Sequence, residues 1–292
     1  MLSSSPLSSY PPFMKSPPVD VLRTTPLRPS DIVIATYPKC GTTLMQQIVL
    51  TLLNSGNDVL DPMGSSPWAE MIAVRDGMEA LETRYSDGTI NGFTDRRVIK
   101  THAPRQLVPW KEPKVEGAKV IVISRNPADT AVSMYHHSCD IPSFQYSGSF
   151  RHFLCALFIP GKVESGCFWE WHRGWRREWD GGGGEILWVT FEEFKDDPRD
   201  VVTRVAGHIG LGDVGEDVVG KTIEGCSFGR MKANAEKVDG EKMKKGLFVK
   251  KNHIRKGMKG AWRKKMTEEE AGWIMGKQKE EEGKGDVGFF EF

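Results

Sequence analysis

Four short apolar segments along the chain predict buried β-strands. They are residues 32–35 (IVIA), 97–101 (RVIKT), 119–124 (KVIVIS) and 185–191 (EILWVTF). Short runs rich in β-branched residues are typical of strands that are covered by other parts of the protein. The hydrophobic period changes between them, because residues 42–54 repeat their apolar positions at helical spacing. Strands and helices therefore alternate along the chain, as they do in α/β proteins.

A second pattern, in residues 149–179, consists of aromatic side chains at helical spacing. Trp171, Trp175 and Trp179 recur every four residues, and Phe168 lies about one turn earlier, so all four share one helical face. A stripe of this kind is typical of core packing, and we expect this segment to support the fold.

The junction between the first strand and its helix concentrates groups that bind anions. Residues 36–43 (TYPKCGTT) form a turn that leads into a helix start, where free N–H groups and the helix dipole attract negative charge. Lys39 adds a positive charge, and Thr42 and Thr43 add hydroxyl donors. The pattern predicts a P-loop-like site for a phosphate or sulfate group. The alternative is an ordinary strand-to-helix connection with a capping threonine.

This loop differs from the loop that binds nucleoside triphosphates. That loop reads G-x-x-x-x-G-K-[ST], with the lysine after the second glycine. Here Lys39 comes two residues before Gly41, and no glycine precedes it in the turn. A small-molecule kinase would also need an aspartate for Mg²⁺, and none is evident, so a kinase is the less favoured hypothesis.

Two other predicted strands are followed by residues that could bind an anion or accept a proton. His102 follows the second strand beside Lys100, and Arg125 follows the third. Ligands of open α/β sheets bind at the carboxyl ends of the strands. Ser133 lies eight residues after Arg125 across a helix start, so a guanidinium and a hydroxyl could converge on one phosphate. From these residues alone, a structural histidine and a surface salt bridge remain alternatives.

Composition narrows the class of partner and the compartment. Lys and Arg number 40 against 39 Asp and Glu, and no apolar run reaches the length of a membrane span, so neither a nucleic-acid nor a membrane partner is predicted. The five cysteines are an odd, scattered set without C-x-x-C. This set suits a reducing compartment, and a cytoplasmic location without disulfides or a metal site is predicted.

The first 18 residues differ in composition from the rest. They are rich in Ser and Pro, which predicts a disordered tail over 1–18 and one domain over 19–292. An organellar transit peptide is the alternative, although Lys15 and Arg23 are few basic residues for one.

Four stretches of this sequence occur in an order that is characteristic of one family. They are Tyr37–Thr43 (YPKCGTT), Lys100–His102 (KTH), 124–133 (SRNP, ending at Ser133) and 255–262 (RKGMKGAW). They resemble the signature segments of sulfotransferases that use 3′-phosphoadenosine 5′-phosphosulfate (PAPS). A single loop would be weak support, but four stretches in order, over residues 31 to 270, are specific. The chain most resembles the cytosolic-type branch that acts on small molecules.

The resemblance implies one α/β domain with a central parallel sheet flanked by helices, the sulfotransferase fold. It implies transfer of the sulfuryl group of PAPS, without a metal, to a hydroxyl or amine of a small organic acceptor. His102 would be the general base, Lys39 would stabilise the leaving phosphate, and Lys100 would steady the sulfuryl oxygens. The implied cofactor-binding residues are Lys39, Cys40, Gly41, Thr42, Thr43, Leu44, Arg125, Ser133, Phe191, Cys226, Ser227, Phe228, Met231, Arg255, Lys256 and Gly257.

The acceptor pocket has weaker support. Trp68 resembles an aromatic residue that the family places in its pocket, and Phe144 and Phe150 suggest an apolar or aromatic acceptor. Ordinary core or lid packing is the alternative for Trp68, because buried aromatic residues are common.

Several positions depart from the family pattern. Leu44 replaces a Trp that stacks on adenine, Phe191 replaces a cofactor-contacting Tyr, and Ala261 replaces the Asp of a G-D-W segment. These departures keep open a non-catalytic or altered-specificity nucleotide-binding relative. The family's dimer motif is matched only loosely at 264–270, so a monomer or weak homodimer is predicted.

Cys40 stands where the family has a serine. Because it adjoins Lys39 near a helix start, we expect a lowered thiol pKa, so that alkylation there would block the nucleotide. The alternative is a cysteine that only fills the space of a serine.

Overall fold

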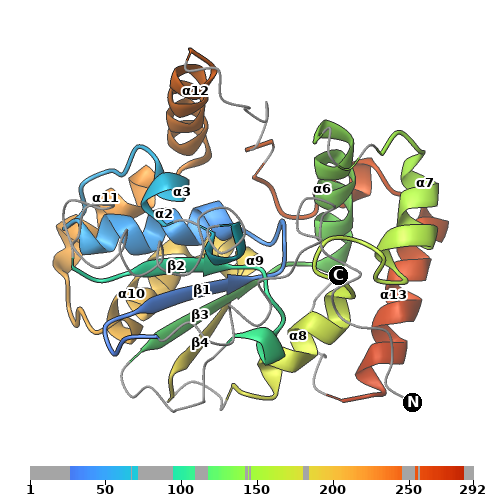
Figure 1. The fold of residues 1–292 in the computed structure, drawn as a ribbon, viewed down its shortest axis with the longest axis horizontal. Helices are drawn as coiled ribbons and strands as arrows, with labels where there is room; N and C mark the ends of the chain where they lie inside the picture. Colours follow the sequence, from blue (N-terminus) through green and yellow to red (C-terminus); the bar gives the residue numbers. More distant parts are fainter. Residues whose placement is uncertain are drawn as a thin grey trace.

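The computed structural model describes residues 27–66, 68–71, 95–108, 118–141, 144, 146–179, 184–244, 254–255 and 257–285. Its centre is a sheet of four parallel strands in the order β2-β1-β3-β4 (Figure 1). The strands are β1 (Ile32–Thr36), β2 (Val98–Thr101), β3 (Lys119–Ser124) and β4 (Ile186–Thr190). All four predicted strands are confirmed, as is the single α/β domain with a parallel sheet. The predicted tail, 1–18, lies outside the described residues.

The alternation of side chains along β1 explains why the sheet is covered on both faces. Ile32 and Ile34 join one buried cluster, whereas Val33 and Ala35 join the other. The first cluster packs against helices α2 (Thr42–Leu53), α10 (Pro198–His208) and α11 (Gly215–Gly225). The second packs against α6 (Pro127–Asp140), α8 (Phe168–Arg176) and α13 (Glu268–Glu282). Both predicted faces of the core are therefore filled by helices.

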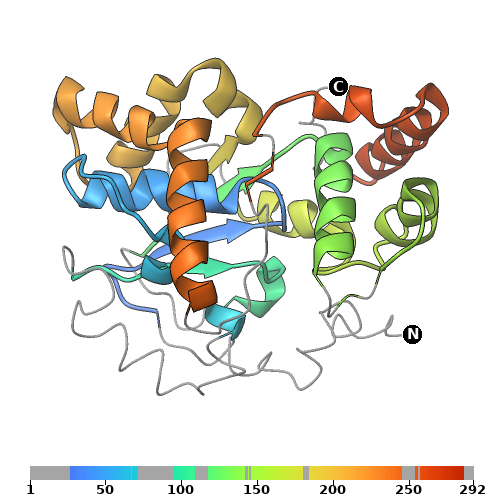
Figure 2. The ribbon, with the colours of Figure 1, turned by 90° about the horizontal axis from the view of Figure 1, so that it is seen from above.

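The remaining elements are short or peripheral. In both views α6 and α13 lie near α7 (Phe150–Phe153), beyond the carboxyl ends of the strands (Figures 1 and 2). Helix α12 (Phe228–Lys244) stands away from the sheet in Figure 1 and, seen from above in Figure 2, lies over the strands. The others are α3 (Pro62–Ser65), η3 (Arg105–Leu107), η5 (Leu154–Phe158), α9 (Phe191–Asp196) and η6 (Ala261–Lys264).

Local sequence signals set several helix boundaries. Asn126 caps α6 by accepting hydrogen bonds from the amides of Ala128 and Asp129, and Pro127 occupies the first helical position. The aromatic stripe is confirmed as core for Trp171 and Trp175. Helix α8 ends at Arg176, however, so Trp179 lies beyond it and is only partly buried.

Candidate active site

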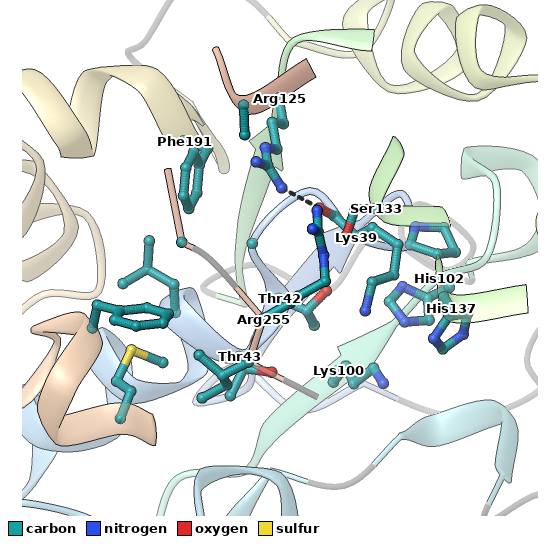
Figure 3. Close-up of a pocket in the computed structure, with 18 of the residues that line it drawn as sticks. Lys39, Thr42, Thr43, Lys100, His102, Arg125, Ser133, His137, Phe191 and Arg255 are labelled. Atoms are coloured by element: carbon teal, nitrogen blue, oxygen red, sulfur yellow. Dashed lines mark hydrogen bonds between the residues drawn. The ribbon is translucent and has the colours of Figure 1, made fainter. Parts of the chain in front are cut away.

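A cavity of about 360 Å³ opens at the carboxyl ends of β1, β2 and β3, within the size range of small-ligand sites (Figure 3). We divide its lining into two ends, with Lys39 between them in the view of Figure 3. The loop end comprises Gly41, Thr42, Thr43, Leu44, Arg125, Ser133, Phe191, Cys226, Phe228, Met231, Ile254, Arg255 and Gly257. The His102 end comprises Trp68, Lys100, His102, His137, Ile141, Phe144 and Glu164.

The turn between β1 and α2 has a backbone that few residues adopt. Lys39 has φ 73° and Gly41 has φ 116°, both in the left-handed region. A Cβ at position 41 would lie 2.9 Å from the Cδ1 of Ile123, so only glycine fits there. Gly41 is also the N-cap of α2, and its lack of a side chain keeps the helix start accessible to a ligand. Non-glycine residues held in this region often mark binding sites.

His102 is held in one orientation by its surroundings. Its Nδ1 lies 2.7 Å from the carbonyl oxygen of Thr36, which can only accept, so the ring proton is on Nδ1 and the lone pair is on Nε2. The backbone amide of His102 donates to the Glu70 carboxylate at 2.7 Å, and its carbonyl accepts from the Trp171 indole at 2.9 Å. Burial, followed by the charge of Lys100, holds the pKa of His102 well below its usual value, which keeps the imidazole neutral.

Lys100 lies in the cavity wall beside Trp68. Its ammonium is 4.4 Å from the centre of the Trp68 ring, and the Trp68 ring meets that of His102 edge to face at 5.1 Å. Desolvation lowers the pKa of Lys100 to about 8, against the opposing effect of the Glu70 and Glu164 charges. A parallel bridge between Trp68 and Lys100 fixes this arrangement to β2.

Arg125 is anchored from several directions at the loop end. It donates to the carbonyl of Lys39 at 3.4 Å (dashed in Figure 3) and to that of Met258 at 2.9 Å. Its guanidinium lies 4.5 Å from the centre of the Phe191 ring and 3.8 Å from the Asp129 carboxylate. The guanidinium is therefore held in place at the wall of the cavity.

Asp129 connects this region to a segment that is far away in the sequence. Its carboxylate accepts hydrogen bonds from the amides of Gly260 at 2.6 Å and Trp262 at 2.9 Å. These bonds hold the chain that carries Arg255 and Gly257 against α6. Gly257 has φ 57°, and a Cβ there would lie 2.7 Å from the Cδ2 of Phe228. Glycine is thus required where this segment closes the cavity.

Most of the residues predicted for the site line this one cavity, but three do not. Cys40 is buried beneath the loop, 3.6 Å from the hydroxyl of Thr130, Ser227 is exposed, and Phe150 packs against Tyr135 in the core. Lys256 lies outside the described residues. The expected low pKa of Cys40 is wrong, because burial raises the pKa of the thiol to about 12. The alternative, a cysteine that fills the space of a serine, agrees with this environment.

Sequence reasoning missed several residues that line the cavity: Pro38, His137, Ile141, Glu164, Lys195, Ile254 and Ala261. His137 could have been found, because it lies four residues after Ser133 on α6 and so shares its helical face. Glu164 lies in an irregular stretch before α8, where periodicity carries no signal.

The described residues show neither a metal-ligand cluster nor a membrane-spanning helix. No three His, Cys, Asp or Glu side chains there are grouped as metal ligands would be. Within the same ranges, every helix is too short or too polar to cross a lipid bilayer.

Comparison with known proteins gives the family. A sulfotransferase domain model matches residues 29–274. Sulfotransferase 1 family member D1 of Rattus norvegicus is 31% identical over 253 residues, which cover 82% of this chain and 79% of the rat protein.

Solved structures of sulfotransferases resemble this chain as well. Mouse sulfotransferase SULT7A1, complexed with PAP, is 26% identical with a TM-score of 0.74, covering 94% of this chain and 93% of the mouse chain. Retinol dehydratase in complex with androsterone and inactive cofactor PAP is 21% identical with a TM-score of 0.72, covering 92% and 85%, a likeness of fold alone. The family match runs from before the first strand into the last helix and includes every element that forms the cavity, so the chain belongs to the sulfotransferase family and is an enzyme of sulfuryl transfer.

Proposed function

We propose that this sulfotransferase takes its sulfuryl group from PAPS and transfers it to a hydroxyl, or an amine, of a small organic acceptor. The observation that supports the proposal most is that Lys39, Arg125 and His102, which come from three different strand ends, line one cavity. The similar mouse structure was solved with PAP. PAP, 3′,5′-adenosine bisphosphate, is what remains of PAPS after transfer.

The loop end has the chemistry that a doubly phosphorylated nucleotide requires. Arg125, Arg255 and the hydroxyls of Thr42, Thr43 and Ser133 line this end of the cavity. Two more cations adjoin it: Lys39, which lies between the two ends, and Lys195, which lines the cavity beside the Phe191 ring. In our proposal Arg125, Ser133 and Arg255 hold the 3′-phosphate, whereas Lys39, Thr42 and Thr43 hold the 5′-phosphosulfate. Lys256 stays a predicted ligand of the 3′-phosphate.

The adenine would be held by apolar contacts at the loop end. Leu44, Phe191, Cys226, Phe228 and Met231 line this part of the cavity. Phe191 also stacks with Arg125, so its ring orders the guanidinium in place of the hydrogen bond that a tyrosine would make to the cofactor. We do not extend the proposal to Ser227 or to the Cys40 side chain, which lie away from the cavity.

When bound, PAPS supplies the sulfuryl group. His102 takes the proton of the acceptor hydroxyl on Nε2, because Nδ1 is committed to Thr36 and the low pKa keeps the ring unprotonated near neutral pH. Lys39 neutralises the charge that grows on the leaving phosphate oxygen, and Lys100 steadies the sulfuryl oxygens. The cations that perform these tasks all belong to the chain, so the proposal needs no metal.

The proposal also includes the cellular location and the oligomeric state of the enzyme. All five cysteines are unpaired in the structure, which supports a cytoplasmic location. We propose a monomer or weak homodimer, because the 264–270 segment matches the family's dimer motif only loosely.

Two measurements test the proposal. Thermal shift should show stabilisation by PAP and none by ATP with Mg²⁺. Incubation with sulfur-labelled PAPS should then transfer label to members of a panel of phenols, sterols and flavonoids. Stabilisation by ATP–Mg²⁺ alone would favour a kinase, and PAP binding without transfer to any acceptor would contradict the catalytic roles of His102, Lys39 and Lys100.

A further inference from the structure

The His102 end contains one feature that sulfuryl transfer itself does not require, a buried carboxylate. Glu164 lines the cavity with a side chain that is only 5% exposed. Its Oε2 lies 3.3 Å from Nε2 of His137, which also lines the cavity. His137 lies beside His102 in Figure 3 and is close enough to affect the charge of that ring.

Apart from Lys100, His102 and His137, the rest of this end is apolar. Trp68, Ile141 and Phe144 line it, and the Phe144 ring lies 5.6 Å from that of His137. Charges interact more strongly in such surroundings than in water, so the Glu164 carboxylate acts on any charged group that enters, beside the partners that it already has. An acceptor that brings a positive group would therefore gain from Glu164, and one that brings a carboxylate would be repelled.

The cations near Glu164 do not remove its preference for an acceptor that carries a positive charge. Lys100 interacts with the Glu164 charge, but in the proposed mechanism Lys100 serves the sulfuryl oxygens. His137 occupies one side of the carboxylate and, with Phe144, forms part of the same wall. Glu164 is thus the acidic side chain that lines this end of the cavity among the residues that the structure describes.

We infer that the preferred acceptor is a small phenol carrying a cationic amine, and that Glu164 is the residue that selects it. This inference rests on the proposed function, because it assumes that the acceptor hydroxyl is placed at His102. The phenol ring would pack among Trp68, Ile141 and Phe144, and the ammonium would approach the Glu164–His137 pair.

The test compares three phenols that differ in one substituent: tyramine, para-ethylphenol and para-hydroxyphenylpropionate. They carry an ammonium, a neutral and a carboxylate group. For the wild-type enzyme, we expect kcat/KM to be about tenfold higher for tyramine than for para-ethylphenol, the scale of one charge-assisted hydrogen bond, and lowest for the carboxylate. Equilibrium binding of the same compounds to the PAP-saturated protein, followed by tryptophan fluorescence, should give the same order.

Glu164→Gln, which keeps the shape and removes the charge, should bring the ratio of tyramine to para-ethylphenol close to one. Because the readout is a ratio, a general loss of activity cancels. Glu170→Gln is the matched control, since Glu170 is exposed on α8 and lies away from the cavity. His137→Phe keeps the carboxylate and should keep the preference for tyramine.

Equal use of the three phenols by the wild-type enzyme would overturn the inference, and so would an unchanged ratio in Glu164→Gln. If Glu164→Gln does not fold, the wild-type order of the three phenols still decides. Failure of the proposed function looks different: PAP would give no thermal shift, and none of the phenols would be sulfated.

Discussion

At the loop end of the cavity, one turn provides the three side chains that we propose to hold the 5′-phosphosulfate, whereas at the His102 end the lining comes from scattered parts of the chain. Thr42 and Thr43 are consecutive at the start of α2, with Lys39 in the same turn. Trp68, His102, His137 and Glu164 come instead from four separate segments.

A short sequence motif can therefore encode a phosphate site more readily than an acceptor pocket. In the proposed function, a strand, a turn and a helix start provide the amides, hydroxyls and lysine that hold the 5′-phosphate, and these groups are neighbours in the sequence. An acceptor differs from enzyme to enzyme, and its contacts form only when distant segments fold together. The turn that we propose to hold the 5′-phosphosulfate should therefore behave as it does in relatives, whereas the contacts of His137 and Glu164 should be particular to this chain.

The largest expected effect separates the two ends directly. His102→Ala should lower kcat by about 10²-fold or more, the usual worth of a general base, while the thermal shift with PAP stays intact. Single-turnover measurement with labelled PAPS checks this. His152→Ala is the control, because His152 is exposed on α7. Full turnover in His102→Ala would remove the residue from the role of base.

Substitution of Lys39 should impair both nucleotide binding and turnover, because Lys39 lies between the two ends of the cavity. We expect Lys39→Met to lower turnover by about 10²- to 10³-fold, as for loss of one group that stabilises the developing charge, and also to weaken PAP binding. Lys162→Met, at an exposed position, provides the matched loss of one positive charge. Normal PAP affinity in Lys39→Met, measured by calorimetry, would contradict the assigned position of the 5′-phosphate.

The pH dependence of kcat/KM reports the ionisation of groups in the free enzyme, here His102 and Lys100. The lowered pKa of His102 means that protonation does not impair the base as the pH falls through 6.5, so activity should persist there. The pKa of Lys100, about 8, means that its charge is lost as the pH rises past 8, so activity should fall about tenfold per pH unit beyond it. Lys100→Arg should move this fall in kcat/KM to higher pH. If the fall stays at the same pH in Lys100→Arg, another group causes it.

The smallest expected effect concerns the loop end alone. Leu44→Trp should restore an aromatic face toward the adenine and tighten PAP binding by about 1 kcal/mol, roughly fivefold. The ratio of kcat values for different acceptors should not change. Leu44→Met, which conserves volume without a flat ring, is the control. Weaker binding in Leu44→Trp would show that the ring meets the cavity wall and not the base.

The comparison also explains what could be predicted from the sequence. All four strands and the turn that joins the first strand to its helix could be predicted, because composition and apolar spacing act over a few residues. The shared cavity of Lys39, His102 and Arg125 was expected from the rule that ligands bind where parallel strands end.

The failures concern the direction in which a side chain points. Cys40 adjoins Lys39 in sequence, yet its thiol faces the buried Thr130, so burial rather than the neighbouring charge decides its pKa. An aromatic residue such as Phe150 can line a pocket or pack in the core. In this fold its ring packs against Tyr135 in the core. Glu164 is close to His137 only through the tertiary fold, and no periodic pattern connects two positions 27 residues apart.

A crystal structure with PAP and a phenol would show whether the loop end binds the nucleotide and whether His102 faces the acceptor. We expect the 3′-phosphate to contact Arg125 and Ser133, the 5′-phosphate to contact Lys39 and the start of α2, and the phenol oxygen to lie within hydrogen-bond distance of the Nε2 of His102. A nucleotide bound elsewhere, or a phenol oxygen out of reach of that nitrogen, would contradict the account.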